Sequence, residues 1–465
     1  MLSSMKTRRD RSLILIAALL HGLTYCLLLP AWMGEDEPWH VEYAHHISTG
    51  HMPWGGIEMH GAARPEDDDR SIMALSQLQV RRRLGGLKPS ELGQTQEAIL
   101  DSMREEDFFR RVDFAPWSGG AENFDQVQEA FTATHQPPLY YMIGAAALKI
   151  ANAKTPLEEL RVLRSIALLC YLLVILLTFL IARLVTDDLW LVALAGFICA
   201  WIPMHARQAA VVNNDVLAKL VGGALLLAGA LQLSSKRREL TPSAIAGLII
   251  LIAIAFVTKT TVFACVLCAG LAYVTAPARG DAGKTLAASL ACGGVLAVGY
   301  GYWRATHSPS LPTSWGQLSE RLGQGLSSTN LSELWRTSVG AFNWYSRDLP
   351  TGVSTLALTG SSLLLFAALW QLRRGGKNDR GILTLCLLAL IAQYGMIAMR
   401  GVSAGRYLFP VLPAIATLLA VGATHLGPKF TKRRVVAGFV IAFIAMDAVF
   451  LWRGLLVEQY LVWGN

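Results

Sequence analysis

The chain has 465 residues, of which 53% are hydrophobic and only 16% are charged, and its mean hydropathy is +0.41. These values are too apolar for an ordinary soluble protein of this length. The formal net charge is +8 at pH 7, but the basic residues stand in short clusters between apolar stretches, where they face anionic lipid and not a nucleic-acid groove. The composition therefore excludes a soluble globular protein and a nucleic-acid-binding protein, and it predicts a membrane protein.

Eleven apolar stretches have about the length that a helix needs to cross the hydrocarbon core of a bilayer. They lie at 12–33, 161–185, 189–207, 215–233, 242–258, 260–277, 285–303, 353–372, 381–399, 407–426 and 435–452. We therefore expect an all-α polytopic membrane protein with about eleven transmembrane helices. The first stretch follows a basic N-terminus, as in a secretory signal, but it is longer than a signal's apolar core and lacks a small-residue cleavage site. We expect it to be retained as the first helix.

Clusters of Lys and Arg set the expected orientation, because these residues favour cytoplasmic loops. They occur at the N-terminus, at 236–238, near 279–284, at 373–380 and at 429–434. With eleven crossings and a cytoplasmic N-terminus, every cluster falls in the cytoplasm. The stretch 137–151 is too short to cross, and counting it as a crossing would move the 236–238 cluster outside. We expect it to form an interfacial helix on the outer surface.

This topology divides the chain into six segments. They are the cytoplasmic N-terminus with the first helix (1–33), an extracytoplasmic cap (34–160), helices two to seven (161–303), an extracytoplasmic loop (304–352), helices eight to eleven (353–453) and a short extracytoplasmic tail (454–465). Acidic residues outnumber basic residues in the first external loop, and its segments 72–84 and 90–112 have helical patterns. We expect the cap to be a small folded unit.

Polar residues with useful chemistry gather on the expected outer face. Asp36, Glu37 and His40 follow the first helix directly. The others lie where the cap returns to the membrane, at outer turns, and at the start of the tenth helix: His135, Gln136, Tyr140, Arg207, Asn214, Asp215, Lys259, Arg406 and Tyr407. Ionisable groups near the lipid boundary are costly unless they are paired or used. This face is therefore the candidate site.

The residue types favour an anionic lipid substrate. Residues 242–277 are too long for one crossing, so Lys259 marks the tip of a tight hairpin that faces outside. Arg406 and Lys259 are suited to holding a phosphate, Arg through a bidentate fork and Lys as a point charge. A nearby carboxylate is suited to act as a general base on an acceptor hydroxyl that attacks a sugar carbon.

Each of these features also has a purely structural interpretation. Carboxylates after a membrane helix are often a solvated helix end, and Asn213 before an apolar stretch is a good N-cap. Lys259 can extend its amine to the interface, and Arg406 can anchor a helix to lipid head groups. The histidines of the cap show no spacing typical of metal ligands, so we expect no cofactor, although a divalent metal stays an alternative. The seven cysteines all lie in apolar stretches, which argues against disulfides.

Four motifs on this face resemble those of the GT-C superfamily of membrane glycosyltransferases. They are DEPWH at 36–40, HQPPLYY at 135–141, VNND at 212–215 and GRYLFP at 405–410. The closest resemblance is to the branch with protein O-mannosyltransferase-like and lipid A aminoarabinose transferase-like enzymes and related uncharacterised bacterial membrane proteins. It extends from the first to the tenth predicted helix and implies a GT-C-like bundle with a cap in the first loop.

The resemblance implies an inverting glycosyltransferase that moves a sugar from a polyprenyl-phosphate carrier to a hydroxyl acceptor on the extracytoplasmic face. Asp36 matches the family's proposed base in the first external loop, and Glu37 is the alternative. Asp215 corresponds to the acidic residue after the third crossing, and the basic residues would bind the carrier phosphate. His135 and Gln136 occupy the entry to the interfacial helix, where family members contact donor or lipid.

The expected location is the cell membrane, with a bacterial inner membrane as the most fitting one. The partners are a polyprenyl-phosphate-linked sugar, membrane lipids and an acceptor. The chain lacks the extra soluble domains of the mannosyltransferase branch, so a lipid-linked glycan or envelope polymer fits the acceptor, and a protein hydroxyl stays open. A lipid or glycolipid transporter or flippase is the alternative, but the sequence shows no duplicated halves of the kind common in transporters. A non-catalytic scaffold would not explain why carboxylates and cations converge.

Overall fold

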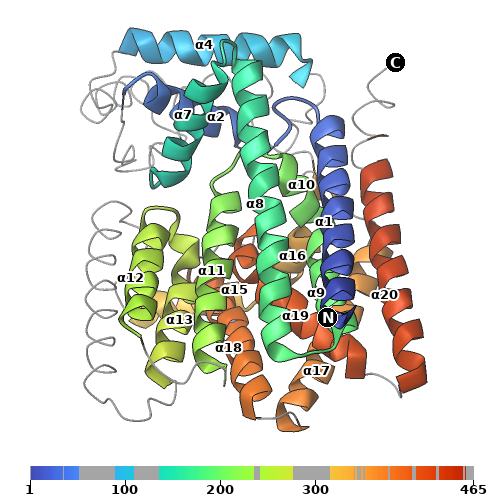
Figure 1. Ribbon diagram of the computed structural model, residues 1–465. Coiled ribbons are helices and arrows are strands. Elements are labelled where there is room, and N and C mark those ends of the chain that lie inside the picture. Colours follow the sequence, from blue (N-terminus) through green and yellow to red (C-terminus); the bar gives the residue numbers. More distant parts are fainter. Residues whose placement is uncertain are drawn as a thin grey trace.

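The computed structural model of the protein describes residues 2–34, 36–51, 89–108, 133, 136–234, 241–275, 315–339, 341–342, 347–348, 351–374, 377–400, 405–425, 429–453 and 456. These residues are almost entirely helical, which confirms the predicted class. The described strands are the two-residue segments β1 (Ala341–Phe342) and β2 (Arg347–Asp348), which pair antiparallel. Long helices lie roughly side by side, and shorter helices lie across one end of the bundle (Figure 1).

Helix α1 (Leu2–Leu28) ends earlier than the predicted stretch 12–33, because Pro30 lacks a backbone N–H and restricts the residue before it. The chain then turns sharply, with left-handed backbone angles at Trp32 (φ 66°) and Asp36 (φ 64°). Helix α2 (Glu37–Ser48) follows at once, with Pro38 in its first turn. The residue that precedes α2 is therefore the aspartate that the sequence singles out.

Helices α2, α4 (Pro89–Glu105) and α7 (Leu139–Ala151) lie at one end of the bundle (Figure 1). Helix α7 covers most of the predicted interfacial helix 137–151, and α4 begins one residue before the helical segment expected at 90–112 and covers its first part. The segment expected at 72–84 lies outside the described residues. His45 of α2 contacts Glu159 of α8 over 2.7 Å, and Trp32 donates to Ser102 of α4 over 3.2 Å. Side-chain contacts therefore attach α2 to α8, and α4 to the turn after α1.

Helix α8 (Pro156–Val185), with 30 residues, is the longest of the described helices. It begins with a capping box in which Thr155 accepts from the Glu158 backbone and Glu158 accepts from the Thr155 backbone, which satisfies donors that a helix start leaves free. This capping box explains why α8 begins before the predicted stretch at 161. The next stretch, predicted as one helix at 189–207, is broken.

The break separates α9 (Leu189–Trp201) from α10 (Pro203–Arg207), which is followed by the short η2 (Gln208–Ala210). The two parts are bent by 63°. Ile202 between them has extended backbone angles, as expected for a residue that precedes a proline. Pro203 thus turns the chain so that 208–215 runs toward the end of the bundle where α2 lies.

Helix α11 (Asp215–Leu233) has the bounds that the sequence predicts. Helices α12 (Pro242–Phe256) and α13 (Phe263–Thr275) form the expected hairpin, with Lys259 at its turn before the single-turn η3 (Thr260–Val262). The external loop predicted at 304–352 contains two helices that the apolar pattern does not reveal, α15 (Trp315–Gly325) and α16 (Ser328–Val339). Both are short and partly polar, so a search for long apolar stretches passes over them.

The last part of the chain contains α17 (Thr351–Arg374), α18 (Lys377–Arg400), η4 (Gly405–Val411), α19 (Leu412–His425) and α20 (Lys429–Phe450). The predicted stretch 407–426 is therefore a short 3₁₀ segment that leads into α19. Pro410 within η4 explains why this segment is a 3₁₀ helix and not the first turn of an α-helix, because a proline removes one helical donor. Arg406 lies on η4 and not on a regular helix.

Among the described residues, five helices are long and apolar enough to cross a membrane, or six if the bent pair α9 and α10 is one span. Shorter apolar helices lie at 12–28, 139–151, 242–256 and 260–275. The predicted stretch 285–303 lies outside the described residues. The full count of eleven crossings therefore stays a prediction, whereas a membrane protein with several apolar helices is confirmed.

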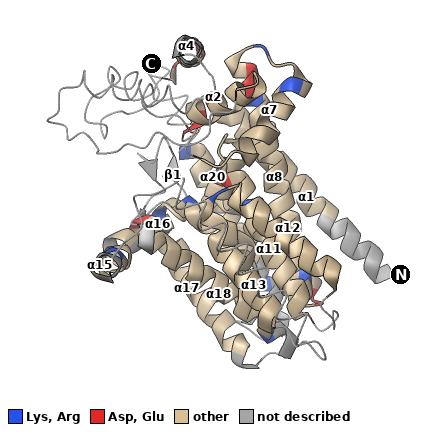
Figure 2. Ribbon diagram, turned by 90° about the vertical axis from the view of Figure 1, so that its left-hand side faces the viewer, with Lys and Arg blue, Asp and Glu red and all other residues tan. Residues whose placement is uncertain are grey.

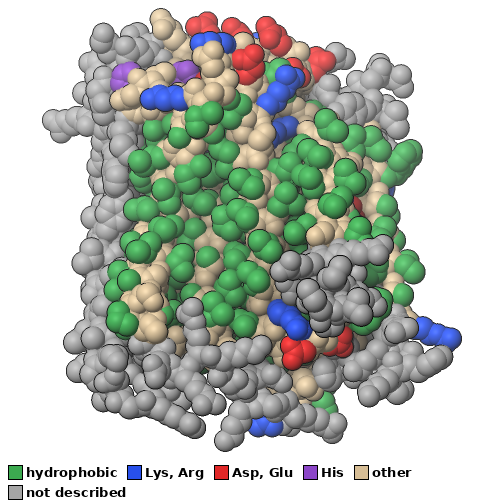
Figure 3. Space-filling model, in the orientation of Figure 1, with side chains coloured by type: hydrophobic (Ala, Val, Ile, Leu, Met, Phe, Trp, Pro, Cys, Tyr) green, Lys and Arg blue, Asp and Glu red, His purple; other side chains and the backbone are tan. Residues whose placement is uncertain are grey.

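The sides of the helices carry the surface expected to face lipid. Hydrophobic side chains cover the middle of one face of the molecule, and charged side chains gather toward its two ends (Figure 3). Large hydrophobic side chains that are exposed on the sides of the helices include Leu169 of α8, Phe366 of α17 and Ile441 of α20. In the charge-coloured ribbon, charged residues lie toward the two ends of the molecule, and a few lie inside the bundle (Figure 2). The few charged residues inside the bundle therefore need a specific explanation.

We expect Gly422→Ala to destabilise the protein, because a methyl group on Gly422 of α19 would clash with the backbone carbonyl of Leu364 in α17. Overpacking of this kind costs about 1 to 3 kcal/mol. The matched control is Gly360→Ala on α17, where an added methyl group meets no described atom within 4 Å and a helical Ala gains about 0.5 to 1 kcal/mol over Gly. Thermal unfolding in detergent measures both, and equal melting temperatures for the two variants would contradict the prediction.

Candidate functional site

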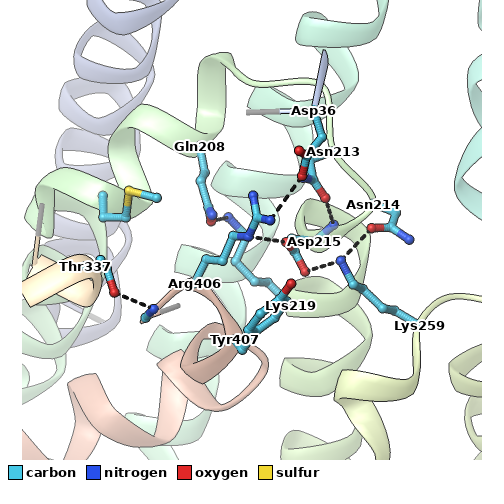
Figure 4. A network of polar contacts seen from close by, with 12 residues as sticks. Asp36, Gln208, Asn213, Asn214, Asp215, Lys219, Lys259, Thr337, Arg406 and Tyr407 are labelled. Atoms are coloured by element: carbon cyan, nitrogen blue, oxygen red, sulfur yellow. Dashed lines mark hydrogen bonds and ion pairs between the residues drawn. The ribbon is translucent and has the colours of Figure 1, made fainter. Parts of the chain in front are cut away.

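Four segments far apart in the sequence meet at the N-terminal end of α11 (Figure 4). They are the turn before α2, the start of α11, the hairpin turn between α12 and α13, and η4. Each contributes one charged side chain to a continuous network: Asp36, Asp215, Lys259 and Arg406. The structure therefore brings together four residues that the sequence analysis singles out.

Arg406 lies between the two carboxylates. Its Nη2 donates to Asp36 Oδ2 over 3.0 Å, and its Nε lies 3.5 Å from Asp215 Oδ2. Lys259 Nζ contacts the other oxygen of Asp215 over 2.7 Å. Charges alternate along this chain of contacts, so each cation offsets the cost of burying a neighbouring carboxylate.

The carboxylates differ in exposure. The Asp36 side chain is 29% exposed, whereas that of Asp215 is 3% exposed. Asp215 is held by two cations at the start of a helix, where the aligned backbone N–H groups also favour a negative charge. Asp36 thus keeps a partly open face, and Asp215 is the buried part of the network.

Two asparagines arrange the start of α11. Asn213 Oδ1 accepts from the backbone N–H of Asp215 over 3.0 Å, so it supports the first turn of α11, although the residue directly before the helix is Asn214. Asn214 Oδ1 accepts from Lys259 Nζ over 2.7 Å, and its amide nitrogen donates to Gln136 Oε1 over 3.1 Å. Asn214 therefore connects the segment that enters α7 to the hairpin that carries Lys259.

Tyr407 lies beside both cations. Its ring centroid is 5.6 Å from Lys259 Nζ and 5.5 Å from the Arg406 guanidinium carbon, distances at which a cation is attracted to an aromatic face.

The η4 segment is held from outside the network by Thr337 of α16, whose hydroxyl accepts from the Gly405 backbone N–H over 2.7 Å. A side chain at Gly405 would clash with the Ser338 backbone, so glycine allows α16 to approach the cation-bearing segment closely.

Lys219 is a member of the site that the sequence analysis missed. It lies one turn below Asp215 on α11, is 1% exposed, and donates to Gln208 Oε1 over 2.8 Å. Its Nζ is 5.7 Å from the ring centroid of Phe409. A lysine within an otherwise apolar stretch, four residues after an acidic one, is the pattern that would have pointed to it.

Glu37 and Arg164 form a second ion pair that adjoins the network. Arg164 Nε and Nη2 donate to the two Glu37 oxygens over 2.9 and 2.8 Å. Glu37 is fully buried, and Arg164 is 7% exposed. The sequence analysis missed Arg164, whose position near the start of a long apolar stretch was the available indication. Glu37, the alternative base, points into this pair.

His40 lies one turn into α2 and contacts the Tyr141 hydroxyl through Nδ1 over 2.7 Å. Burial lowers the pKa of the His40 imidazole to about 3, against an opposing effect of the nearby Asp36 charge. His40 is therefore neutral at physiological pH and cannot supply a positive charge to the site. Tyr140 is fully buried beside Tyr141, with ring centroids 5.4 Å apart.

The remaining predicted residues lie elsewhere or outside the described part. Arg207 is fully buried at the end of α10, where it donates to the backbone carbonyl of Met33 over 3.2 Å. It therefore supports the turn after α1. His135 lies outside the described residues. Within the residues that the structure describes, no group of three or more His, Cys, Asp or Glu side chains is arranged to hold a metal ion.

Comparison with known proteins places the chain in a membrane protein family. Residues 19–415 match the family described as a predicted membrane protein, DUF2142. The chain belongs to this family. No curated protein matches it.

Solved structures that resemble the chain include three of the Archaeoglobus fulgidus oligosaccharyltransferase. The apo form has a TM-score of 0.49 and 13% identity, over 94% of this chain and 56% of that one. The form tethered to an acceptor peptide with an NVT sequon has a TM-score of 0.48 and 13% identity, over 94% and 55%. The complex with Zn and sulfate has a TM-score of 0.46 and 15% identity, over 94% and 52%. The chain thus spans about half the length of that enzyme.

We expect the stability of the folded protein to fall as the pH is lowered, because of His40. Its pKa is about 3 in the folded state and about 6.5 in the unfolded chain. Between these values the unfolded chain binds a proton that the folded protein does not, so lowering the pH favours unfolding by roughly 3 kcal/mol between pH 7 and pH 4.

The measurement compares melting temperature against pH for the wild type and His40→Gln. The variant should show a shallower decline below pH 6.5. His45 has the opposite influence, since its hydrogen bond to Glu159 raises its pKa and its stabilising contribution is kept at low pH. Because both proteins contain His45, parallel declines would contradict the role assigned to His40.

Proposed function

We propose that the protein is an inverting glycosyltransferase of the GT-C type, which transfers a sugar from a polyprenyl-phosphate carrier to a hydroxyl acceptor. The observation that supports this most directly is Arg406 lying between a partly exposed carboxylate, Asp36, and a buried one, Asp215, near the end of apolar helices. Such a site offers a base and fixed cations side by side at the edge of a surface suited to lipid. The sequence motifs that resemble the GT-C superfamily supply all three residues.

The charge of the network favours an anionic ligand. The four ionisable side chains of the network, Asp36, Asp215, Arg406 and Lys259, sum to zero charge, and the buried Lys219, one turn below Asp215, adds a third cation. One positive charge therefore remains after pairing within this set. A phosphate diester on a lipid carrier has the opposite charge, and the planar guanidinium of Arg406 is suited to bind two of its oxygens. Lys219 lies deeper and adds to the field without needing to touch the ligand.

Asp36 is the carboxylate best placed to act as base. Asp215 is held between Lys259 and Arg406, and Glu37 is saturated by hydrogen bonds, whereas Asp36 has an exposed part that an acceptor can reach. In the proposed step the acceptor oxygen forms a bond to the anomeric carbon and its proton passes to the Asp36 carboxylate. The bond from that carbon to the phosphate oxygen breaks, and its electron pair stays on the phosphate.

The cations would lower the barrier of this step. Negative charge grows on the departing phosphate in the transition state, so a fixed cation at that point stabilises the transition state more than the bound donor. Arg406 contacts Asp36 directly, which would place the base and the leaving group within one arrangement. Attack from the side opposite to the phosphate inverts the configuration at the sugar carbon.

The remaining partners follow from the same proposal. The isoprenoid chain of the donor would lie against the apolar outer halves of the helices, and α7 would border its entry. Gln136, joined to Asn214, would lie on this path. The acceptor is a lipid-linked glycan, an envelope polymer or a protein hydroxyl. The location is a bacterial inner membrane, with the site on the extracytoplasmic side and the N-terminus in the cytoplasm.

The decisive experiment supplies purified protein in detergent with radiolabelled polyprenyl-phosphate sugars and an extract of envelope lipids. A glycosyltransferase releases carrier phosphate and labels an acceptor. A lipid transporter or flippase releases no carrier phosphate. Absence of phosphate release with every donor tested, from protein whose folding is verified, would refute the proposed function.

Asp36→Asn should reduce the turnover number about a thousandfold, because an amide cannot accept the acceptor's proton and general-base catalysis contributes on that scale. Asparagine tolerates the left-handed backbone at this position, so the fold should be preserved. Asp101→Asn on the exposed surface of α4 is the control. Transfer assays at saturating donor measure the effect, and a turnover number within a few-fold of wild type would exclude Asp36 as base.

Arg406→Ala should raise the donor KM about 10- to 100-fold, as is typical for loss of a charged hydrogen bond, and should also lower the turnover number, because the lost cation stabilises the transition state more than the bound donor. Arg161→Ala, which removes an exposed arginine from α8, is the matched control and should leave KM unchanged. Initial rates over a range of donor concentrations provide the measurement. An unaltered dependence on donor concentration in Arg406→Ala would show that this side chain does not bind the carrier phosphate.

A further inference from the structure

The turn that carries Asp36 is fastened at a single buried point. Glu37, the next residue, accepts four hydrogen bonds. Two come from Arg164, one from the Gly34 backbone N–H over 2.9 Å, and one from the Val212 backbone N–H over 2.9 Å. One carboxylate therefore joins the turn before α2, helix α8 and the segment that leads into α11.

Arg164 extends this junction to the end of α1. Besides its two bonds to Glu37, its Nη1 donates to the Leu29 carbonyl over 2.8 Å and its Nη2 to the Pro30 carbonyl over 2.9 Å. These carbonyls belong to the residues after α1, where the helical hydrogen bonds end. Both ends of the turn from Leu29 to Glu37 are thus held by one guanidinium on the rigid helix α8.

We infer that Glu37 and Arg164 are a positioning pair for the proposed transfer reaction, so this inference rests on the proposed function. Asp36 lies directly beside Glu37 and has a left-handed backbone, φ 64° and ψ 8°. A residue other than glycine keeps such a conformation only when its surroundings impose it. The pair imposes it from Glu37 and thereby aims the Asp36 carboxylate at Arg406.

The same pair also fixes the position of the second carboxylate, Asp215. Val212, whose backbone donates to Glu37, is followed by Asn213, which accepts from the Asp215 backbone. The segment with Asp215 and the turn with Asp36 are therefore anchored on the two oxygens of one side chain. A shift of Glu37 would change the separation of the two carboxylates on either side of Arg406.

The hydrogen bonds made by Glu37 and Arg164 explain why a buried ion pair, and not an apolar pair, occupies this position. A buried ion pair is often no more stabilising than a well-packed apolar pair, because both charges must leave water. An apolar pair, however, would leave two backbone N–H groups and two carbonyls without these partners. Lysine in place of Arg164 would keep the positive charge, but its three donors lie on one nitrogen, so it cannot make the four hydrogen bonds that the Arg164 fork makes to Glu37 and the two carbonyls. Arg164→Lys therefore separates charge from positioning.

The first test measures position without relying on activity. Cysteines replace Asp36 and Arg406, and a short membrane-impermeant reagent that joins two thiols reports how readily they meet. Arg164→Lys in this background should lower the rate of cross-linking at least several-fold. The control is Asp447→Asn, which disturbs a different buried pair, Asp447 of α20 with His21 of α1, 2.7 Å apart. It should change melting temperature but not cross-linking. An unchanged rate in Arg164→Lys would overturn the inference, whatever the protein's activity.

The second test uses the chain with Asp36 and Arg406 intact. Arg164→Lys and Glu37→Gln should lower the turnover number about a hundredfold, since displacement of a catalytic group by about 1 Å has effects of this size, while the donor KM stays within a few-fold. Asp447→Asn should keep its turnover number. If Arg164→Lys and Asp447→Asn lose turnover in proportion to their loss of melting temperature, the pair is only structural and the inference fails. If the wild type transfers no sugar, the proposed function fails, and the cross-linking result still decides the positioning.

Discussion

The site depends on one physical constraint, the cost of placing charges at the edge of an apolar bundle. Asp215 is almost fully buried and stays compatible with its surroundings because Lys259 and Arg406 lie against it. Arg406 in turn needs Asp36, which belongs to the other end of the chain. No helix carries more than one of these four side chains, so the network exists only when the turn after α1, the α12–α13 hairpin and η4 lie around the start of α11. Fold and site are therefore specified together.

Backbone geometry supports the network at three places. Pro203 turns the chain after α9 and directs 208–215 toward the network. Gly405 lets α16 approach η4 until Thr337 can hold the backbone beside Arg406. The Glu37 and Arg164 pair fixes the turn before α2. Gly405 and Glu37 are direct sequence neighbours of Arg406 and Asp36, whereas Pro203 acts on Asp215 through the segment 208–215.

The sequence predicts the parts of the fold that follow from hydrophobicity. Residues 215–233 and the hairpin around Lys259 agree with the structure because apolar length and a single polar interruption determine them. Orientation by basic clusters places Asp36, Asp215, Lys259 and Arg406 on one face, in agreement with their contacts. The bend at Pro203 and the helices within 315–339 were missed, since one lies inside an apolar stretch and the others are short and amphipathic. Arg164 and Lys219 were missed because their importance comes from their partners, which belong to distant segments.

The left-handed conformation of Asp36 restricts chemistry and backbone at the same residue. A glycine would accept this conformation with ease but has no side chain, and an asparagine would accept it but has no charge. A glutamate would supply the charge on a longer stem, at a backbone angle that it seldom adopts. Aspartate combines a carboxylate with tolerance of a positive φ. The shape of the chain at this point thus selects the residue almost as narrowly as the proposed reaction does.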